Sequence, residues 1–163
     1  MMIKKALYSV IFFLMTVSVA HAAESLSAHQ DLVGPVSESD LLVLDAFAAS
    51  YKTAIISEQE VQLLTSIDSA ISLRVLFGTW CHDSVREVPK LIKLIELAEN
   101  PNLSLRLTAI SRDKLEPSAV VARYGLEFTP TLVVLKDKKE VGRIIEQPDA
   151  NWASDIIALI QQH

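Results

Sequence analysis

The sequence contains a single cysteine, Cys81, among its 163 residues. No disulfide can form within one molecule, so a disulfide-stapled fold and chemistry that needs two cysteines of one chain are excluded. Basic residues are not in excess either, because 20 acidic residues stand against 15 basic ones and give a net charge of −5. This acidic balance argues against a nucleic acid as partner. No His, Cys and Asp residues show metal-ligand spacing, and we expect no metal and no cofactor.

Only one long uncharged hydrophobic run is present, and it lies at the N-terminus. Lys4 and Lys5 precede an uncharged apolar run over residues 6–20, and the Ala-His-Ala sequence of residues 20–22 offers small residues for a signal peptidase. This pattern is typical of a secretory signal. As a membrane anchor the run is short, since a span needs about 20 residues. We predict a signal peptide over residues 1–22, a periplasmic location in a bacterium, and no membrane span after cleavage.

Apolar periodicity in the remaining chain predicts strands and helices in alternation. Compact or alternating apolar runs predict strands at residues 71–77, 103–110, 131–135 and 140–145, the last two joined by residues 137–139 as a hairpin. Apolar residues at helical spacing predict helices over residues 39–50, from Ser57, over 81–100, over 117–124, and from a cap at Asp149. Residues 24–37 are interpreted as a loosely ordered lead-in. Strands separated by helices pair in parallel, so this order predicts a four-stranded mixed sheet between helices.

Three motifs lie at defined places among the predicted strands and helices. Gly78-Thr79-Trp80-Cys81 stands between a buried strand and the longest helix, Pro89 follows the cysteine inside that helix, and Thr129-Pro130 precedes the hairpin. The arrangement resembles the thioredoxin superfamily, whose members carry Trp-Cys-x-x-Cys at a helix start, a kinking proline, and a cis-proline before a core strand. The resemblance covers residues 55–163.

The resemblance implies a fold class and a division of the chain. The fold class is α/β, a thioredoxin-like three-layer sandwich with a mixed central sheet, parallel strands, a C-terminal β-hairpin, and helices on both faces. We expect residues 23–54 to form an N-terminal extension with a helix, and residues 55–163 to form the thioredoxin-like domain.

The sequence departs from the superfamily pattern at two positions. The motif reads Cys81-His82-Asp83-Ser84, so a serine replaces the second cysteine. Thioredoxin also carries a buried aspartate six residues before the first cysteine, where this chain has Val75. The resemblance therefore implies a monothiol variant, and dithiol thioredoxin chemistry does not carry over.

A helix N-terminus presents unpaired N–H groups and a partial positive charge, which stabilise a thiolate. A cysteine placed there acquires a lowered pKa and reacts near neutrality. We expect Cys81 and Ser84 to be catalytic, the serine as a hydrogen-bond donor to the sulfur. His82 either assists as a cation or is an ordinary exposed histidine. Asp83 either opposes the thiolate or, like Ser84, caps the helix.

The resemblance also implies a groove that binds an extended substrate segment along the main chain before the cis-proline. Thr129 and Pro130 match that position, Trp80 would flank the groove, and His82 and Asp83 would lie beside it.

Three functions stay open at this point. The first is thiol–disulfide exchange with protein or glutathione thiols and disulfides, in which Cys81 forms a mixed disulfide that an external thiol resolves. The second is a non-enzymatic peptide-binding module in which the cysteine is incidental. The third is a homodimer linked through Cys81. For the first two functions we expect the protein to be a monomer.

Overall fold

The computed structural model describes residues 31–162. The predicted signal peptide and its cleavage site lie outside the described residues. Between these limits no helix has both the length and the apolar character that crossing a membrane requires.

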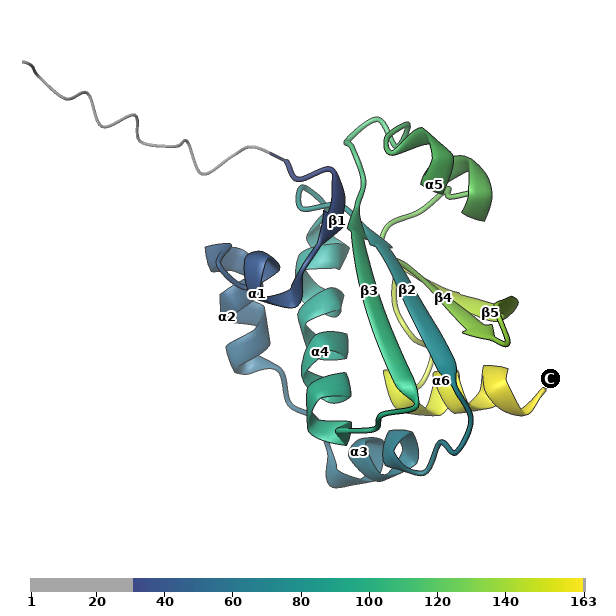
Figure 1. Ribbon diagram of the computed structural model, residues 1–163. Helices are drawn as coiled ribbons and strands as arrows, with labels where there is room; N and C mark the ends of the chain where they lie inside the picture. The colour runs from purple at the N-terminus through teal and green to yellow at the C-terminus, as the bar shows by residue number, and fades with distance from the viewer. Residues whose placement is uncertain (1–30, 163) are drawn as a thin grey trace, which may run out of the picture.

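Eleven elements follow one another along the described chain (Figure 1). They are β1 (Gly34–Val36), α1 (Glu38–Leu41), α2 (Asp45–Thr53), α3 (Glu58–Thr65), β2 (Ile71–Phe77), α4 (His82–Ala98), β3 (Leu103–Ala109), α5 (Ser118–Tyr124), β4 (Thr131–Lys136), β5 (Lys139–Ile145) and α6 (Trp152–Gln161). The fold is the mixed α/β sandwich that the resemblance implied, and that prediction is confirmed.

The sheet has five strands in the order β1-β3-β2-β4-β5. β2 and β3 pair in parallel, and the other neighbours are antiparallel. The prediction of four strands is wrong because residues 34–36 form β1, an edge strand, where we expected a loosely ordered lead-in. Gly34 and Pro35 gave no strand signal, but an edge strand tolerates proline, which has no N–H to donate.

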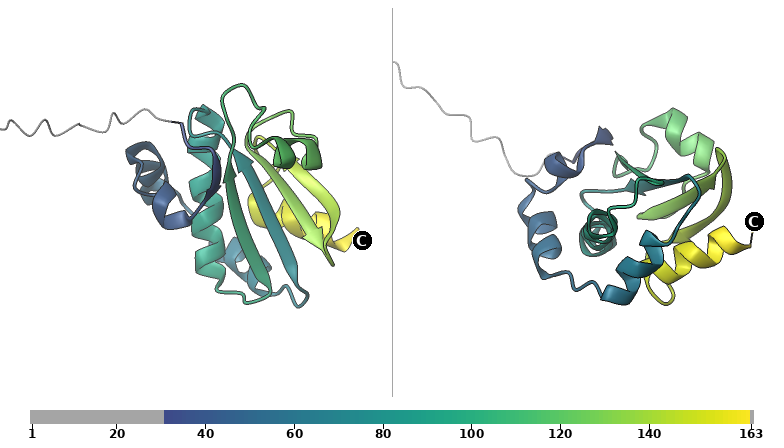
Figure 2. Two further views of the ribbon diagram at one scale, coloured as in Figure 1. Left: turned by 45° about the horizontal axis from the view of Figure 1, so that its top comes forward. Right: turned by 60° about the horizontal axis from the view of Figure 1, so that its bottom comes forward.

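The two faces of the sheet are covered unequally. Alternate residues of β2, from Ile71 to Phe77, enter the main core with α4 and α6, and α2 and α3 pack against α4. On the opposite face Leu76 packs with Ile110 and Leu126 beneath α5 in a small second core. Figures 1 and 2 show α5 near one end of that face, with no helix in front of the middle of β2 and β3.

Two predicted helix boundaries are wrong, and each has a local reason. The helix predicted over residues 39–50 is broken into α1 and α2 at residues 42–44, where Leu44 becomes the extended N-cap of α2. The last helix is capped by Asn151 rather than Asp149, because the Asn151 side chain accepts a hydrogen bond from the Ser154 amide. The capping box of Ser57 with Glu60 is confirmed.

Candidate functional site

Four chain segments meet around Cys81 at the C-terminal end of β2, a central strand of the sheet. The turn after β2 carries Cys81, and the segment before β1 reaches it through Leu32, whose amide donates to Thr79 Oγ1 at 3.0 Å. The loop after β3 contributes Arg112, whose guanidinium lies 5.6 Å from the centre of the Trp80 ring. The loop before β4 contributes Thr129. Figure 1 shows these connections gathered at its upper side.

Cys81 is the N-cap residue of α4, the longest helix. Its amide donates to Gly78 O at 3.0 Å, which closes the turn after β2, and its carbonyl accepts the first helical hydrogen bond from Val85. The side chain makes no capping bond and is half-buried. Instead, Sγ donates to the carbonyl oxygen of Thr129 at 3.1 Å, which fixes the sulfur against the residue before Pro130.

The pKa of the Cys81 thiol lies below its ordinary value. Partial burial is the largest single influence and raises the pKa, but hydrogen bonds outweigh it in sum. They come from Thr129, from the amide and hydroxyl of Ser84, and from the amide of Asp83. The two amides belong to the first turn of α4, where N–H groups have no helical acceptor and favour an anion.

Ser84 occupies the position of the missing second sulfur and is fully buried. Its Oγ accepts a hydrogen bond from the amide of Gly78 at 3.2 Å. Because that bond uses a lone pair of the oxygen, the hydroxyl proton stays available to the Cys81 sulfur. Gly78 is itself required, since a Cβ at this position would lie 2.5 Å from Cε2 of the Trp80 ring.

His82 and Asp83 follow Cys81 in the chain, and no contact joins either side chain to the sulfur within residues 31–162. The His82 side chain is exposed and is not among the groups that shift the Cys81 pKa. The Asp83 carboxylate pairs with Arg86 at 2.6 Å, so its negative charge is offset on the helix surface. Arg86 also pairs with Glu87 at 2.7 Å, a buried carboxylate that the helical pattern alone did not single out.

The predicted groove residues Trp80, Thr129 and Pro130 are brought together with Cys81. Trp80 is half-buried, and its indole N–H donates to the carbonyl of Ile110 at 3.0 Å. Thr129 and Pro130 are buried, and the peptide bond between them is cis. Within residues 31–162 no acceptor takes the amide N–H of Thr129.

The sequence did not point to two nearby residues, because each acquires its place only through the fold. Arg112 lies over Trp80 and pairs with Asp31, 81 residues away along the chain, at 3.1 Å. Phe128, next to Thr129, is 46% exposed and forms an apolar patch under the Lys114 ammonium. An aromatic residue directly before Thr-Pro was the only available signal.

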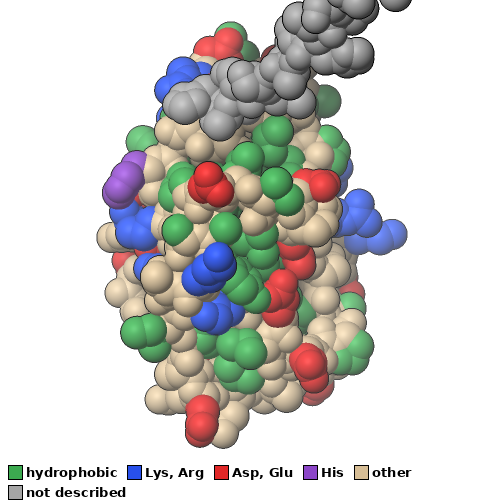
Figure 3. Space-filling view, turned by 90° about the vertical axis from the view of Figure 1, so that its left-hand side faces the viewer, with side chains coloured by type: hydrophobic (Ala, Val, Ile, Leu, Met, Phe, Trp, Pro, Cys, Tyr) green, Lys and Arg blue, Asp and Glu red, His purple; other side chains and the backbone are tan. Residues whose placement is uncertain are grey.

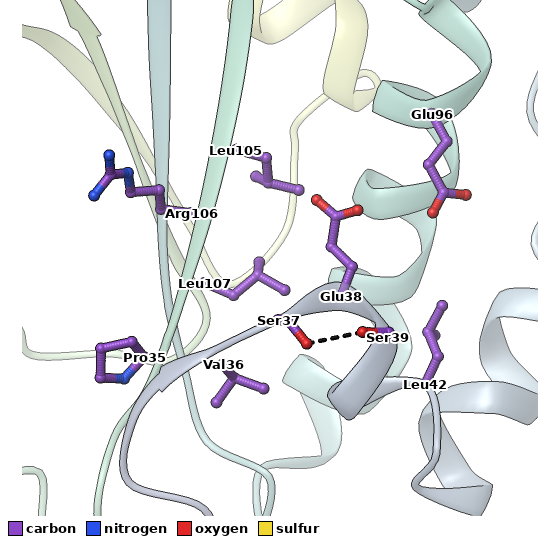
Figure 4. A pocket seen from close by; sticks show the side chains of 10 residues that line it. All are labelled: Pro35, Val36, Ser37, Glu38, Ser39, Leu42, Glu96, Leu105, Arg106 and Leu107. Carbon is purple, nitrogen blue, oxygen red and sulfur yellow. Dashed lines mark hydrogen bonds between the residues drawn. The ribbon is translucent and has the colours of Figure 1, made fainter.

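A cavity of about 690 Å³ lies away from the sulfur. Figure 4 shows Glu38 and Glu96 entering it from α1 and α4. Burial, and then the nearby Glu96 charge, raise the pKa of Glu38. Two carboxylates are too few to suggest a cation site, and within residues 31–162 no three His, Cys, Asp or Glu side chains are grouped to hold a metal. Cys81 does not line this cavity, and its side chain is half-buried.

Comparison with known proteins gives one family and a set of similar folds. A family model described as thioredoxin matches residues 37–156. A Pseudomonas aeruginosa protein of unknown function is similar in structure, at 20% identity over 78% of this chain and 98% of the other, with a TM-score of 0.58. An HIV epitope-scaffold is similar at 22% identity over 72% and 84%, with a TM-score of 0.55. Thioredoxin f2 of Chlamydomonas reinhardtii aligns at 18% identity over 63% and 86%, with a TM-score of 0.43. Among curated proteins, none matches the chain.

Proposed function

Since this chain belongs to the thioredoxin family, we propose that it is an exported monothiol exchange protein that works through Cys81. Family membership supports a thiol–disulfide redox role in general terms. The single cysteine limits the finer role to reactions that one sulfur can perform, and the signal-like sequence of residues 1–22 supports the periplasm as the place of action.

The observation that carries the proposal is the position of the half-buried Cys81 sulfur at the N-cap of α4, against the Thr129 carbonyl, and the lowered pKa of the thiol agrees with that position. The thiolate is the nucleophile in disulfide exchange, and hydrogen bonds that hold it increase its population near neutral pH. An inert core cysteine would be enclosed by aliphatic side chains and would have a raised pKa.

The reaction proceeds in two balanced steps. The Cys81 thiolate attacks one sulfur of a substrate disulfide, a new S–S bond joins it to that sulfur, and the other sulfur leaves as a thiolate that takes up a proton. Ser84 cannot attack this mixed disulfide, so an external thiolate from glutathione, from a second cysteine of the substrate, or from a partner protein displaces Cys81. No net oxidation of this chain occurs, which allows disulfide reshuffling and removal of glutathione.

The partial exposure of Cys81 supports a protein or glutathione disulfide as substrate. The amide of Thr129 has no acceptor within residues 31–162, and an extended substrate segment would accept from it in the manner of an added strand. Phe128, which is exposed beside Thr129, and the half-exposed Trp80 ring would supply apolar contacts to such a segment.

A trapping experiment tests the proposal with the full chain expressed in a bacterium that exports it. Cells are quenched in acid, free thiols are alkylated, and the protein is purified without reductant so that partners bound to Cys81 can be identified by mass spectrometry. We expect mixed disulfides with proteins or glutathione. They should disappear in Cys81→Ser and diminish in Ser84→Cys, which supplies a resolving sulfur one helical turn away.

Two other results would favour different functions. One such result is a Cys81 that carries only the alkylating reagent, while the wild type and Cys81→Ser bind the same proteins noncovalently. That result would favour the non-enzymatic binding module. A disulfide-linked dimer of this chain as the sole species would favour the homodimer.

A further inference from the structure

A basic groove lies on the face of the sheet that α5 leaves partly open. Four cationic side chains line it, and they come from β2, β3, α5 and the β4–β5 turn: Arg74, Arg106, Arg123 and Lys138. The alternation that sends Leu73 and Val75 into the main core turns Ser72 and Arg74 to this face. The cavity measures about 470 Å³, within the range of small-molecule sites.

Within the described chain no carboxylate forms an ion pair with these four cations. None of them takes part in an ion pair or donates a hydrogen bond within residues 31–162, and no carboxylate lines the groove. Figure 4 shows Arg106 extending away from Glu38 and Glu96, the acidic side chains on the other side of β3. Figure 3 shows a different face, where acidic and basic side chains are intermixed around hydrophobic ones.

The register of β2 and β3 brings two like charges together on this face. Arg74 and Arg106 are direct partners in the register of β2 and β3, and neighbouring strands are about 4.8 Å apart. Like charges directly opposite one another destabilise a sheet. In a chain with a net charge of −5, this concentration of positive charge also runs against the overall balance. An anion held between the two guanidinium groups would remove the repulsion.

We propose that the basic groove binds a small phosphate ester that carries an apolar or aromatic group. Guanidinium groups match the oxygen geometry of phosphate and donate to it in pairs. The apolar part has a floor to contact, because Leu76, Tyr124 and Leu135 line the same groove. The site uses none of the residues around Cys81 and does not depend on the exchange reaction.

Titration calorimetry with phenyl phosphate at low ionic strength tests this assignment. We expect saturable binding at one site, with Kd of about 1 mM or tighter, and stronger binding than for inorganic phosphate, which lacks the ring. Arg106→Gln and Arg74→Gln should each weaken binding about tenfold or more, the scale of one charge-assisted hydrogen bond. The matched control Lys52→Gln removes an exposed cation on α2 and should bind as the wild type does.

Thermal unfolding gives a second readout that separates binding from folding. Without ligand, the arginine variants should unfold at the wild-type temperature or above it, because the repulsion is relieved. With phenyl phosphate, the wild type and Lys52→Gln should gain stability that the arginine variants do not. Any of three results would overturn the proposal. They are no saturable binding of phenyl phosphate, a loss of affinity for it in Lys52→Gln as large as in the arginine variants, and tighter binding of an oligoglutamate peptide than of phenyl phosphate.

Discussion

Replacing Ser84 with alanine tests the local structure around Cys81 through two independent readouts. The hydroxyl of Ser84 accepts from the amide of Gly78 at 3.2 Å and helps lower the pKa of the Cys81 thiol. The substitution removes one oxygen from a fully buried site and leaves the Gly78 amide without its partner.

The expected cost in stability follows from that unpaired amide. A buried donor that loses its only acceptor costs about 1–3 kcal/mol. For a chain of this size each kcal/mol lowers the unfolding temperature by about 2–4 °C. Calorimetry should therefore show a loss of several degrees. Ser66→Ala is the matched control, because its hydroxyl is exposed and bonds only a carbonyl of its own helix, and we expect a change within about 0.5 kcal/mol.

The second readout is the rate at which iodoacetamide alkylates Cys81 as a function of pH. A lowered pKa means that the thiolate is populated at lower pH, so losing a donor to the sulfur must move the rate profile of Ser84→Ala to higher pH. Ser66→Ala should keep the wild-type profile. An unchanged profile in Ser84→Ala would refute the assignment of the hydroxyl to the thiolate, and an unchanged unfolding temperature would refute its bond to Gly78.

Three further substitutions have outcomes set by single contacts. Gly78→Ala should displace the Trp80 ring, because the added Cβ has no room, and lower stability by about 1–3 kcal/mol with a change in tryptophan fluorescence. Glu38→Gln should raise the free energy of unfolding at pH 7 by up to about 0.5 kcal/mol, because burial and the Glu96 charge disfavour the ionised form. The gain should vanish in acid, since a raised folded pKa means that the native state takes up its proton first as pH falls, and a gain that persists at pH 3 would contradict this. Glu87→Gln should lower the free energy of unfolding, measured with urea at low salt, by about 1 kcal/mol. The cost is modest because the two basic partners are part-exposed and reach water when the carboxylate is neutralised. An unchanged free energy of unfolding would contradict the two ion pairs.

The central strands, the long helix and the positions of Cys81, Thr129 and Pro130 were predictable because each has a strong local signal. Residues 71–77 are apolar enough to specify a strand alone, and residues 82–98 repeat apolar side chains at helical spacing. The Trp-Cys and Thr-Pro motifs then placed two distant segments at one edge of the sheet, where a 3.1 Å contact now joins them.

Long-range pairing was beyond the reach of local patterns. β1 forms although two of its three residues, Gly34 and Pro35, have little strand propensity, because the segment finds a free edge of β3. Arg112 reaches the site because the fold brings Asp31 beside it. The pairing of Arg74 with Arg106 is equally invisible in the sequence, since it depends on the register of two parallel strands. The ion pair between Asp83 and Arg86 could not be predicted from the helix alone, because it depends on the rotamers of the two side chains as well as on their spacing.

The reaction of the purified wild-type protein with glutathione disulfide, followed by mass spectrometry across a range of pH, tests the central claim most directly. We predict one glutathione per chain, attached at Cys81 and stable until an external thiol is added. The rate should reach half its maximum at a pH below about 8.5, the pKa of a free cysteine. A midpoint at or above that value, or a chain that stays unmodified, would contradict a nucleophilic role for Cys81.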